Sequence, residues 1–112
     1  MDLRTAVVGD ALVVRVDAER IDAACAIQFK DRMREIAAAA PPRVVMDLES
    51  VRFVDSSGLG AIVAVMKFLA PERRLELAAL TANVAKVFHL TRMDHVFPIH
   101  AAAPVAGTDH GG

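Results

Sequence analysis

The sequence predicts one α/β domain, with a mixed sheet of four to five strands and about three helices packed mainly on one side of the sheet. Short β-branched segments alternate with segments whose apolar residues recur every three or four positions, the pattern of strands alternating with helices. Such alternation joins parallel strands through right-handed crossovers. The chain has 112 residues, a length that suits one hydrophobic core, and 54% of them are hydrophobic.

The first half of the chain predicts a hairpin, a helix and a buried strand. Residues 5–16 are rich in apolar and β-branched types and are broken at Gly9-Asp10, a dipeptide typical of a tight turn. Asp22 is placed to cap a helix that stops at Pro41-Pro42, with apolar positions at helical spacing: Ala26, Phe29, Met33, Ile36, Ala37 and Ala40. A central strand follows, because these residues are apolar on both faces: Val44, Val45, Met46 and Leu48.

The second half of the chain predicts two helices and two strands. A helix is expected from about residue 57 to 69, a strand over 75–80 and a helix over about 82–91. Residues 96–99 are expected to add a final edge strand. We expect the domain to span residues 1–100 and residues 101–112, which are small and punctuated by Gly and Pro, to form a flexible tail.

Charge and cysteine content argue against several classes of function. The chain has 13 Lys and Arg against 14 Asp and Glu, a net charge of -1. It therefore lacks the excess of positive charge with which proteins bind the phosphates of nucleic acid. The single cysteine, Cys25, rules out an intrachain disulfide and is compatible with a reducing compartment. No apolar stretch approaches a membrane span, and the N-terminus does not resemble a signal peptide. We therefore expect a cytoplasmic protein without a nucleic-acid or membrane partner.

The patterns of catalytic, metal and nucleotide sites are missing from the sequence. Its four histidines do not fall at metal-ligand spacing on one helix face. No Gly-x-Ser-x-Gly elbow is present and no His precedes residue 89, which argues against a Ser-His-Asp hydrolase. No P-loop ending or Gly-x-Gly-x-x-Gly fingerprint is present. We expect a binding protein, not an enzyme, with no metal and no cofactor.

Residues 47–61 are the segment most informative about function, because a buried strand and a short loop lead there into a helix. Asp55, Ser56 and Ser57 are all good N-cap residues, although one cap would satisfy the helix. Gly58 and Gly60 follow in the first turn, where each costs up to about 1 kcal/mol relative to Ala. Missing side chains would let another molecule approach the backbone closely.

The helix that follows is apolar nearly all round, with Lys67 as its only charge. A surface helix in so small a domain should have a polar face. This helix is therefore either covered by neighbouring helices or offers an apolar patch to a partner. The sequence leaves both possibilities open.

The hexapeptide Asp-Ser-Ser-Gly-Leu-Gly at residues 55–60 resembles the phosphorylation motif of anti-sigma-factor antagonists, which are bacterial STAS domains. Arg20-Ile21-Asp22 resembles the Arg/Glu-Leu-Asp turn before the first helix of that family. The resemblance covers roughly residues 7–99, because the order of strands, helices and motif agrees, and it implies the STAS fold. In two places the chain departs from the family: Glu19 stands where many relatives have Gly, and Pro71-Glu72-Arg73 replaces a common Gly-rich turn.

This resemblance implies control of transcription, or of a related output, by partner switching. Such a protein in its unphosphorylated form binds an anti-sigma factor that is also a serine kinase, and phosphorylation ends the binding. Ser57 matches the phosphoacceptor position, and a serine phosphatase is the expected partner that restores the unmodified form. The residues expected to bind the partner are Asp22, Asp55, Ser56, Gly58, Leu59 and Gly60.

Structural roles would also account for some of these residues. Ser57 would serve as a helix cap, and Asp22 and Asp55 as cap or turn residues. An alternative function within the same fold is a STAS adaptor subunit of a lipid-transport or signalling complex that is never phosphorylated. Loss of the hydroxyl at the acceptor position would indicate that role, whereas this chain retains Ser57.

Overall fold

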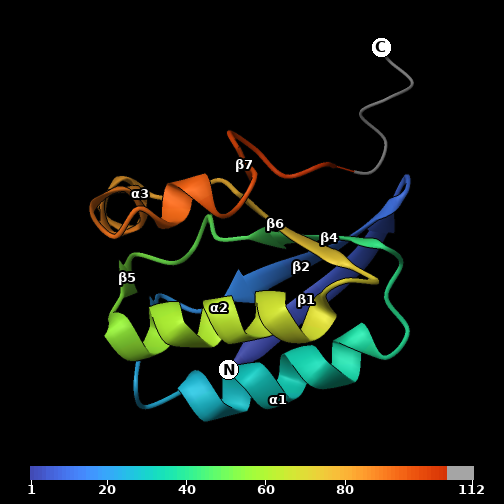
Figure 1. Ribbon diagram of the computed structural model, residues 1–112, viewed down its shortest axis with the longest axis horizontal. Coiled ribbons are helices and arrows are strands. Elements are labelled where there is room, and N and C mark those ends of the chain that lie inside the picture. Colours follow the sequence, from blue (N-terminus) through green and yellow to red (C-terminus); the bar gives the residue numbers. More distant parts are fainter. Residues whose placement is uncertain (106–112) are drawn as a thin grey trace.

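The computed structural model describes residues 1–105 and is built on a five-stranded mixed sheet (Figure 1). Its strand order is β1-β2-β4-β6-β7. An antiparallel hairpin, β1 (Asp2–Val8) and β2 (Ala11–Asp17), forms one edge, with Gly9 in its turn at a φ of 60°. The sheet then continues in parallel through β4 (Arg43–Asp47), β6 (Arg74–Ala78) and β7 (Ile99–His100). The predicted α/β class and the central place of the strand around residue 45 are confirmed.

Three helices accompany the sheet: α1 (Ala26–Ala37), α2 (Ser56–Leu69) and α3 (Ala82–Leu90). In Figure 1, α1 and α2 lie side by side on one face of the sheet. Phe29 and Met33 of α1 are fully buried and belong to the main hydrophobic core. α3 adds Val84 and Phe88 to the same hydrophobic core. The helices thus share one core, as predicted.

The opposite face of the sheet has a much smaller apolar cluster, which consists of Ala11, Val13, Val45 and Ala78. Ala103, from the segment after β7, packs against this cluster. The expected flexible tail, residues 101–112, remains a prediction, and residues 106–112 lie outside the part of the chain that the structure describes.

A buried carboxylate organises the polar part of this second face. Glu76 is 2% exposed and accepts hydrogen bonds from Arg43, Arg74 and His100. Burial alone would raise the pKa of Glu76, but the hydrogen bonds from His100 and Arg43 outweigh burial and hold that pKa below its usual value. The three partners come from β4, β6 and β7, so Glu76 ties these strands together.

Several element boundaries differ from the expected ones. α1 begins at Ala26 with Cys25 at its N-cap, so the prediction that Asp22 caps this helix is wrong. Asp22 instead accepts a hydrogen bond from the backbone N–H of Ala24 at 3.1 Å, a local turn contact that Asp forms readily. The strand expected over 75–80 ends at Ala78, because Ala79 takes a left-handed φ of 59°.

The final edge strand is shorter and later than expected. β7 covers only Ile99–His100, because a 3-10 helix, η1 (Met93–His95), lies just before the segment 96–99. Two further strands were not predicted at all: β3 (Arg20–Ile21) and β5 (Phe53–Val54) pair in parallel as a separate small sheet. Two-residue strands are too short to produce a periodic pattern.

Candidate functional site: the first turn of α2

The small β3–β5 sheet brings two loops from distant parts of the chain to the start of α2. Arg20 lies opposite Phe53 in its register, and Ile21 lies opposite Val54. The carbonyl oxygen of Glu19 extends the pairing by accepting a hydrogen bond from the backbone N–H of Phe53 at 3.1 Å. This pairing places the predicted Arg-Ile-Asp turn beside the predicted phosphorylation motif.

Asp55 holds these two segments together. It is the N-cap of α2, where its Oδ1 accepts a hydrogen bond from the backbone N–H of Gly58 at 2.8 Å. Its Oδ2 accepts a second hydrogen bond from the backbone N–H of Ala23 at 3.2 Å. The capping role that the sequence left open thus belongs to Asp55, and the same carboxylate fixes the turn before α1 against α2.

Because Asp55 supplies the cap, the two serines that follow it are relieved of that role. Ser56 and Ser57 are the first two residues of α2 and both are exposed. Neither side chain makes a hydrogen bond to another residue of the described range 1–105. The backbone N–H groups of a first helical turn and the helix macrodipole favour a negative charge at this position. Ser57 therefore offers a free hydroxyl where an anion would be stabilised.

The two glycines of this turn have different surroundings. A Cβ on Gly58 would overlap the carbonyl oxygen of Ile21 and lie 2.6 Å from its carbonyl carbon. Gly58 is therefore required by close packing of α2 on β3, within this chain. A Cβ on Gly60 would meet nothing within 4 Å. Of the two, only Gly60 leaves open space at the surface for another molecule.

An ion pair and an aromatic ring lie on the surface beside this turn. Asp22 Oδ2 accepts a hydrogen bond from Arg20 Nε at 3.0 Å, and this bond holds the pKa of the Asp22 carboxyl below its usual value. The Arg20 guanidinium lies over the ring of Phe53, 4.3 Å from its centroid, and Phe53 is 41% exposed. No sequence pattern points to Phe53, because its position depends on the unpredicted β3–β5 pairing.

The apolar character of α2 is explained by its neighbours. None of its large apolar side chains is strongly exposed, and Leu59 and Met66 are half-buried against the core. α1 packs alongside it, and the guanidinium of Arg34 lies 5.2 Å from the ring centroid of Phe68. Of the two possibilities that the sequence left open, the structure supports a covered helix.

Two other features, a metal-holding group and a membrane-spanning helix, are not found among the described residues. Among residues 1–105, no three His, Cys, Asp or Glu side chains gather into a group that could hold a metal ion. Over the same range, no helix combines the length and apolarity needed to cross a bilayer.

Comparison with known proteins places this geometry in a family. The chain matches the family model of the STAS domain over residues 2–105. It is similar to the crystal structure of an anti-sigma factor antagonist from Mycobacterium paratuberculosis, with a TM-score of 0.79 and 27% identity over 90% of this chain and 86% of that one.

Three structures with lower sequence identity share the fold. The anti-sigma factor antagonist SpoIIAA in its unphosphorylated form has a TM-score of 0.70 and 21% identity over 90% of this chain and 89% of that one. The phosphorylated form of SpoIIAA, described as a Bacillus cell fate determinant, has a TM-score of 0.65 at 21% identity, over 90% of this chain and 92% of that one. A sulfate transporter family protein from Wolinella succinogenes has a TM-score of 0.70 at 10% identity, over 87% and 82% of the two chains. Since the family model spans almost the whole described chain, this protein belongs to the STAS domain family.

Proposed function

We propose that the protein is an anti-sigma-factor antagonist that works by partner switching. Unphosphorylated, it binds an anti-sigma factor that is also a serine kinase, and phosphorylation of Ser57 ends this binding until a serine phosphatase removes the phosphate. The protein acts by binding and by being modified, not by catalysis, and it acts in the cytoplasm. The observation that carries the proposal is the exposed, unbonded Ser57 hydroxyl in the first turn of α2.

Phosphorylation at this position would change the surface more than the fold. A phosphoserine carries about -1.5 to -2 charges at neutral pH, and a helix N-terminus favours an anion. Asp55 accepts the hydrogen bond that caps the helix, so modification of Ser57 removes no native cap. In a desolvated contact, however, an unpaired dianion costs several kcal/mol, enough to lower affinity by more than about a hundredfold.

The proposed partner surface surrounds Ser57. Ser56 and Gly60 are exposed and can be contacted directly, while Asp22 and Leu59 are half-buried. Asp55 and Gly58 support the surface from below, through the cap and the close packing on β3. The similarity to proteins described as anti-sigma factor antagonists supports this assignment of the partner.

Intact-mass measurement after incubation with the cognate kinase and ATP tests the proposal. The wild type should gain one phosphate and Ser57→Ala none. Ser56→Ala is the matched control, because it removes the neighbouring exposed hydroxyl and should still gain one phosphate. Phosphate still gained by Ser57→Ala, or none gained by Ser56→Ala, would contradict the assignment.

A second candidate function is a STAS adaptor subunit that is never phosphorylated, in a lipid-transport or signalling complex. The similarity to a sulfate transporter family protein favours it, because the same fold is present there at 10% identity. If the protein is such an adaptor, it should be unphosphorylated in cells under every growth condition. It should also copurify stably with the other subunits of the complex. Intact mass of the protein isolated from its own cells separates the two candidates.

A further inference from the structure

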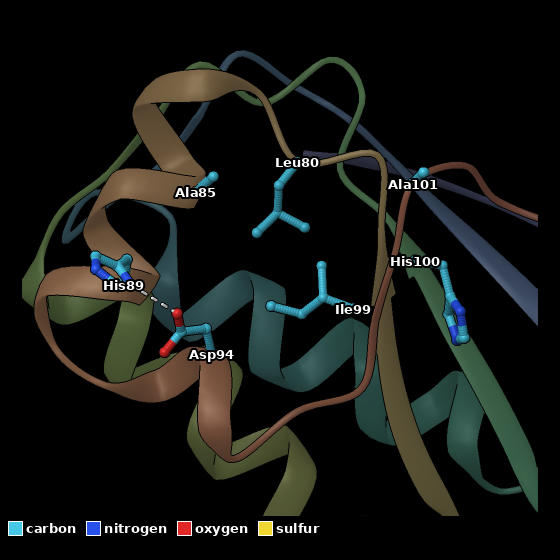
Figure 2. A pocket seen from close by; sticks show the side chains of 7 residues that line it. All are labelled: Leu80, Ala85, His89, Asp94, Ile99, His100 and Ala101. Atoms are coloured by element: carbon cyan, nitrogen blue, oxygen red, sulfur yellow. Dashed lines mark hydrogen bonds and ion pairs between the residues drawn. The ribbon is translucent and has the colours of Figure 1, made fainter.

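A cavity of about 470 Å³ opens beside α3, and no part of the proposed switching mechanism uses it. It lies where the parallel strands β6 and β7 end, and ligands of open α/β sheets commonly bind outside the carboxyl ends of the strands. Leu80 and Ile99 extend from two different segments into the same space, with His89 and Asp94 at one end (Figure 2). The volume falls in the range of small-molecule pockets.

Strained backbone flanks this cavity on two segments. Ala79 and Arg92, at φ values of 59° and 62°, are the non-glycine residues with positive φ among residues 1–105. Ala79 directly precedes Leu80, and Arg92 joins α3 to η1, the short helix that carries Asp94. Such conformations are costly for residues with a Cβ and concentrate at ligand sites and switches. Ala79 adjoins the lining residue Leu80, and Arg92 lies two residues before the lining residue Asp94.

The apolar part of the cavity leaves large side chains uncovered. Ile99 is 38% exposed although it belongs to a sheet strand, and Leu80 is half-buried. Ala85 of α3 adds a small side chain to the lining, which leaves the space open. An apolar ligand body would remove these surfaces from water, which is favourable.

The polar end presents one accessible group. His89 Nδ1 lies 2.9 Å from Asp94 Oδ2, and this hydrogen bond holds the pKa of Asp94 below its usual value. The Asp94 carboxylate thus accepts a hydrogen bond from His89 Nδ1–H, and in the imidazolium form of His89 the Nε2–H is a second donor that can reach a ligand. Asp94 Oδ1 is buried and so is closed to a cationic ligand. His100, also in the lining, engages Glu76 through its Nε2 at 2.8 Å, and its ring points away from Leu80 and Ile99 in Figure 2.

We propose that this cavity binds a small organic acid, whose apolar body lies against Leu80 and Ile99 and whose carboxylate accepts a hydrogen bond from Nε2–H of the imidazolium form of His89. The site is separate from Ser57 and does not depend on the function proposed above. An imidazole held by a carboxylate is already oriented, so the ligand contact costs no further side-chain ordering.

Titration of the full chain with octanoate, followed by NMR of labelled Ile and Leu methyl groups, tests the site. The methyl signals of Ile99 and Leu80 should shift and saturate. Ile27, which is 70% exposed on α1, reports non-specific contact and should not shift. Ala85→Leu places a larger side chain in the cavity at an exposed helical position and should abolish the saturable shifts, with a thermal melt showing that this variant is folded.

Comparing the affinities for octanoate and for its neutral analogue octanol tests whether the cavity recognises the acid group of the ligand. His89→Gln should weaken octanoate binding by about tenfold, since the neutral Gln amide cannot replace a positively charged donor to the carboxylate, and should change octanol binding by less than about twofold. His95→Gln is the matched control, because His95 also lies near Asp94, at 3.8 Å, but does not line the cavity. Its octanoate affinity should equal that of the wild type.

Three results would overturn the proposal. Absence of saturable shifts at Ile99 and Leu80, or equal shifts at Ile27, would show that the cavity is not a ligand site. Unchanged binding to Ala85→Leu would place the ligand elsewhere. Equal affinities for octanol and octanoate, or no effect of His89→Gln, would show that the organic-acid class is wrong.

Discussion

The first turn of α2 has an inward side and an outward side, and the two differ in nearly every physical property. On the inward side, Gly58 touches the backbone of Ile21 and Asp55 caps the helix while holding the turn before α1. On the outward side, the Ser57 hydroxyl is unbonded and Gly60 faces open space. Residues of one short motif thus serve two purposes: the inward ones fix the geometry, and the outward ones are free to be modified or contacted.

Gly58→Ala should have the largest effect on stability. Its Cβ would meet the carbonyl group of Ile21, a backbone group that can move only if β3 shifts. We expect the free energy of unfolding to fall by about 3 kcal/mol, as overpacking in a tight contact does. Urea denaturation measures this free energy of unfolding. A Gly58→Ala protein as stable as the wild type would show that this contact does not explain the glycine.

Asp55→Ala should have the next largest effect, because it leaves two backbone N–H groups without their acceptor. Loss of a helix cap typically costs about 1–2 kcal/mol. Asp55→Asn is the matched control: its carbonyl oxygen can still cap Gly58, while its amide nitrogen cannot accept from Ala23. We expect its urea midpoint to lie between those of wild type and Asp55→Ala. Equal midpoints for all three proteins would contradict the bridging role of this carboxylate.

The sequence predicted features that depend on local pattern. Periodicity identified α2 and the central strand β4, and the cluster of cap residues identified a helix start at residues 55–57. Each of these signals is contained within a few turns or a few strand residues, so one sequence is enough to recognise it.

Features that depend on long-range pairing were not predictable in the same way. The β3–β5 sheet is two residues long on each side, and it alone explains why Arg20 covers Phe53 and why Gly58 has no side chain. Asp22 was expected at a helix start because Asp is a good cap, but a local turn competes for the same carboxylate. A cap residue predicts an acceptor for a nearby N–H, not which N–H it will bind.

Gly60→Ala should have a smaller effect of the opposite sign. The added methyl group meets nothing within 4 Å, so it should raise the free energy of unfolding by about 0.5–1 kcal/mol through helix propensity. If a partner approaches the backbone here, the same variant should bind that partner more weakly. Urea denaturation and a partner titration measure the two quantities. A destabilised Gly60→Ala protein would contradict the open surroundings assigned to this residue.

Ser57→Asp should change stability least of the four. A carboxylate in the first turn gains about 0.3–1 kcal/mol from the macrodipole, and the Asp55 cap is untouched, so the melting temperature should match or slightly exceed that of the wild type. Affinity for the proposed anti-sigma partner should nevertheless fall, because a charge is desolvated at the contact. The loss should be smaller than for the phosphoserine, which carries a higher charge.

Ser57→Ala is the control for this last comparison, because it removes the hydroxyl without adding a charge and should keep binding the partner as permanently unmodified protein. A thermal melt paired with a titration against the partner distinguishes electrostatic exclusion from a change of fold. If Ser57→Asp melted far below the wild type, the outward side of the turn would be part of the structural framework after all. If it bound as tightly as Ser57→Ala, charge at this position would not control the partner, and switching would have to act through another residue.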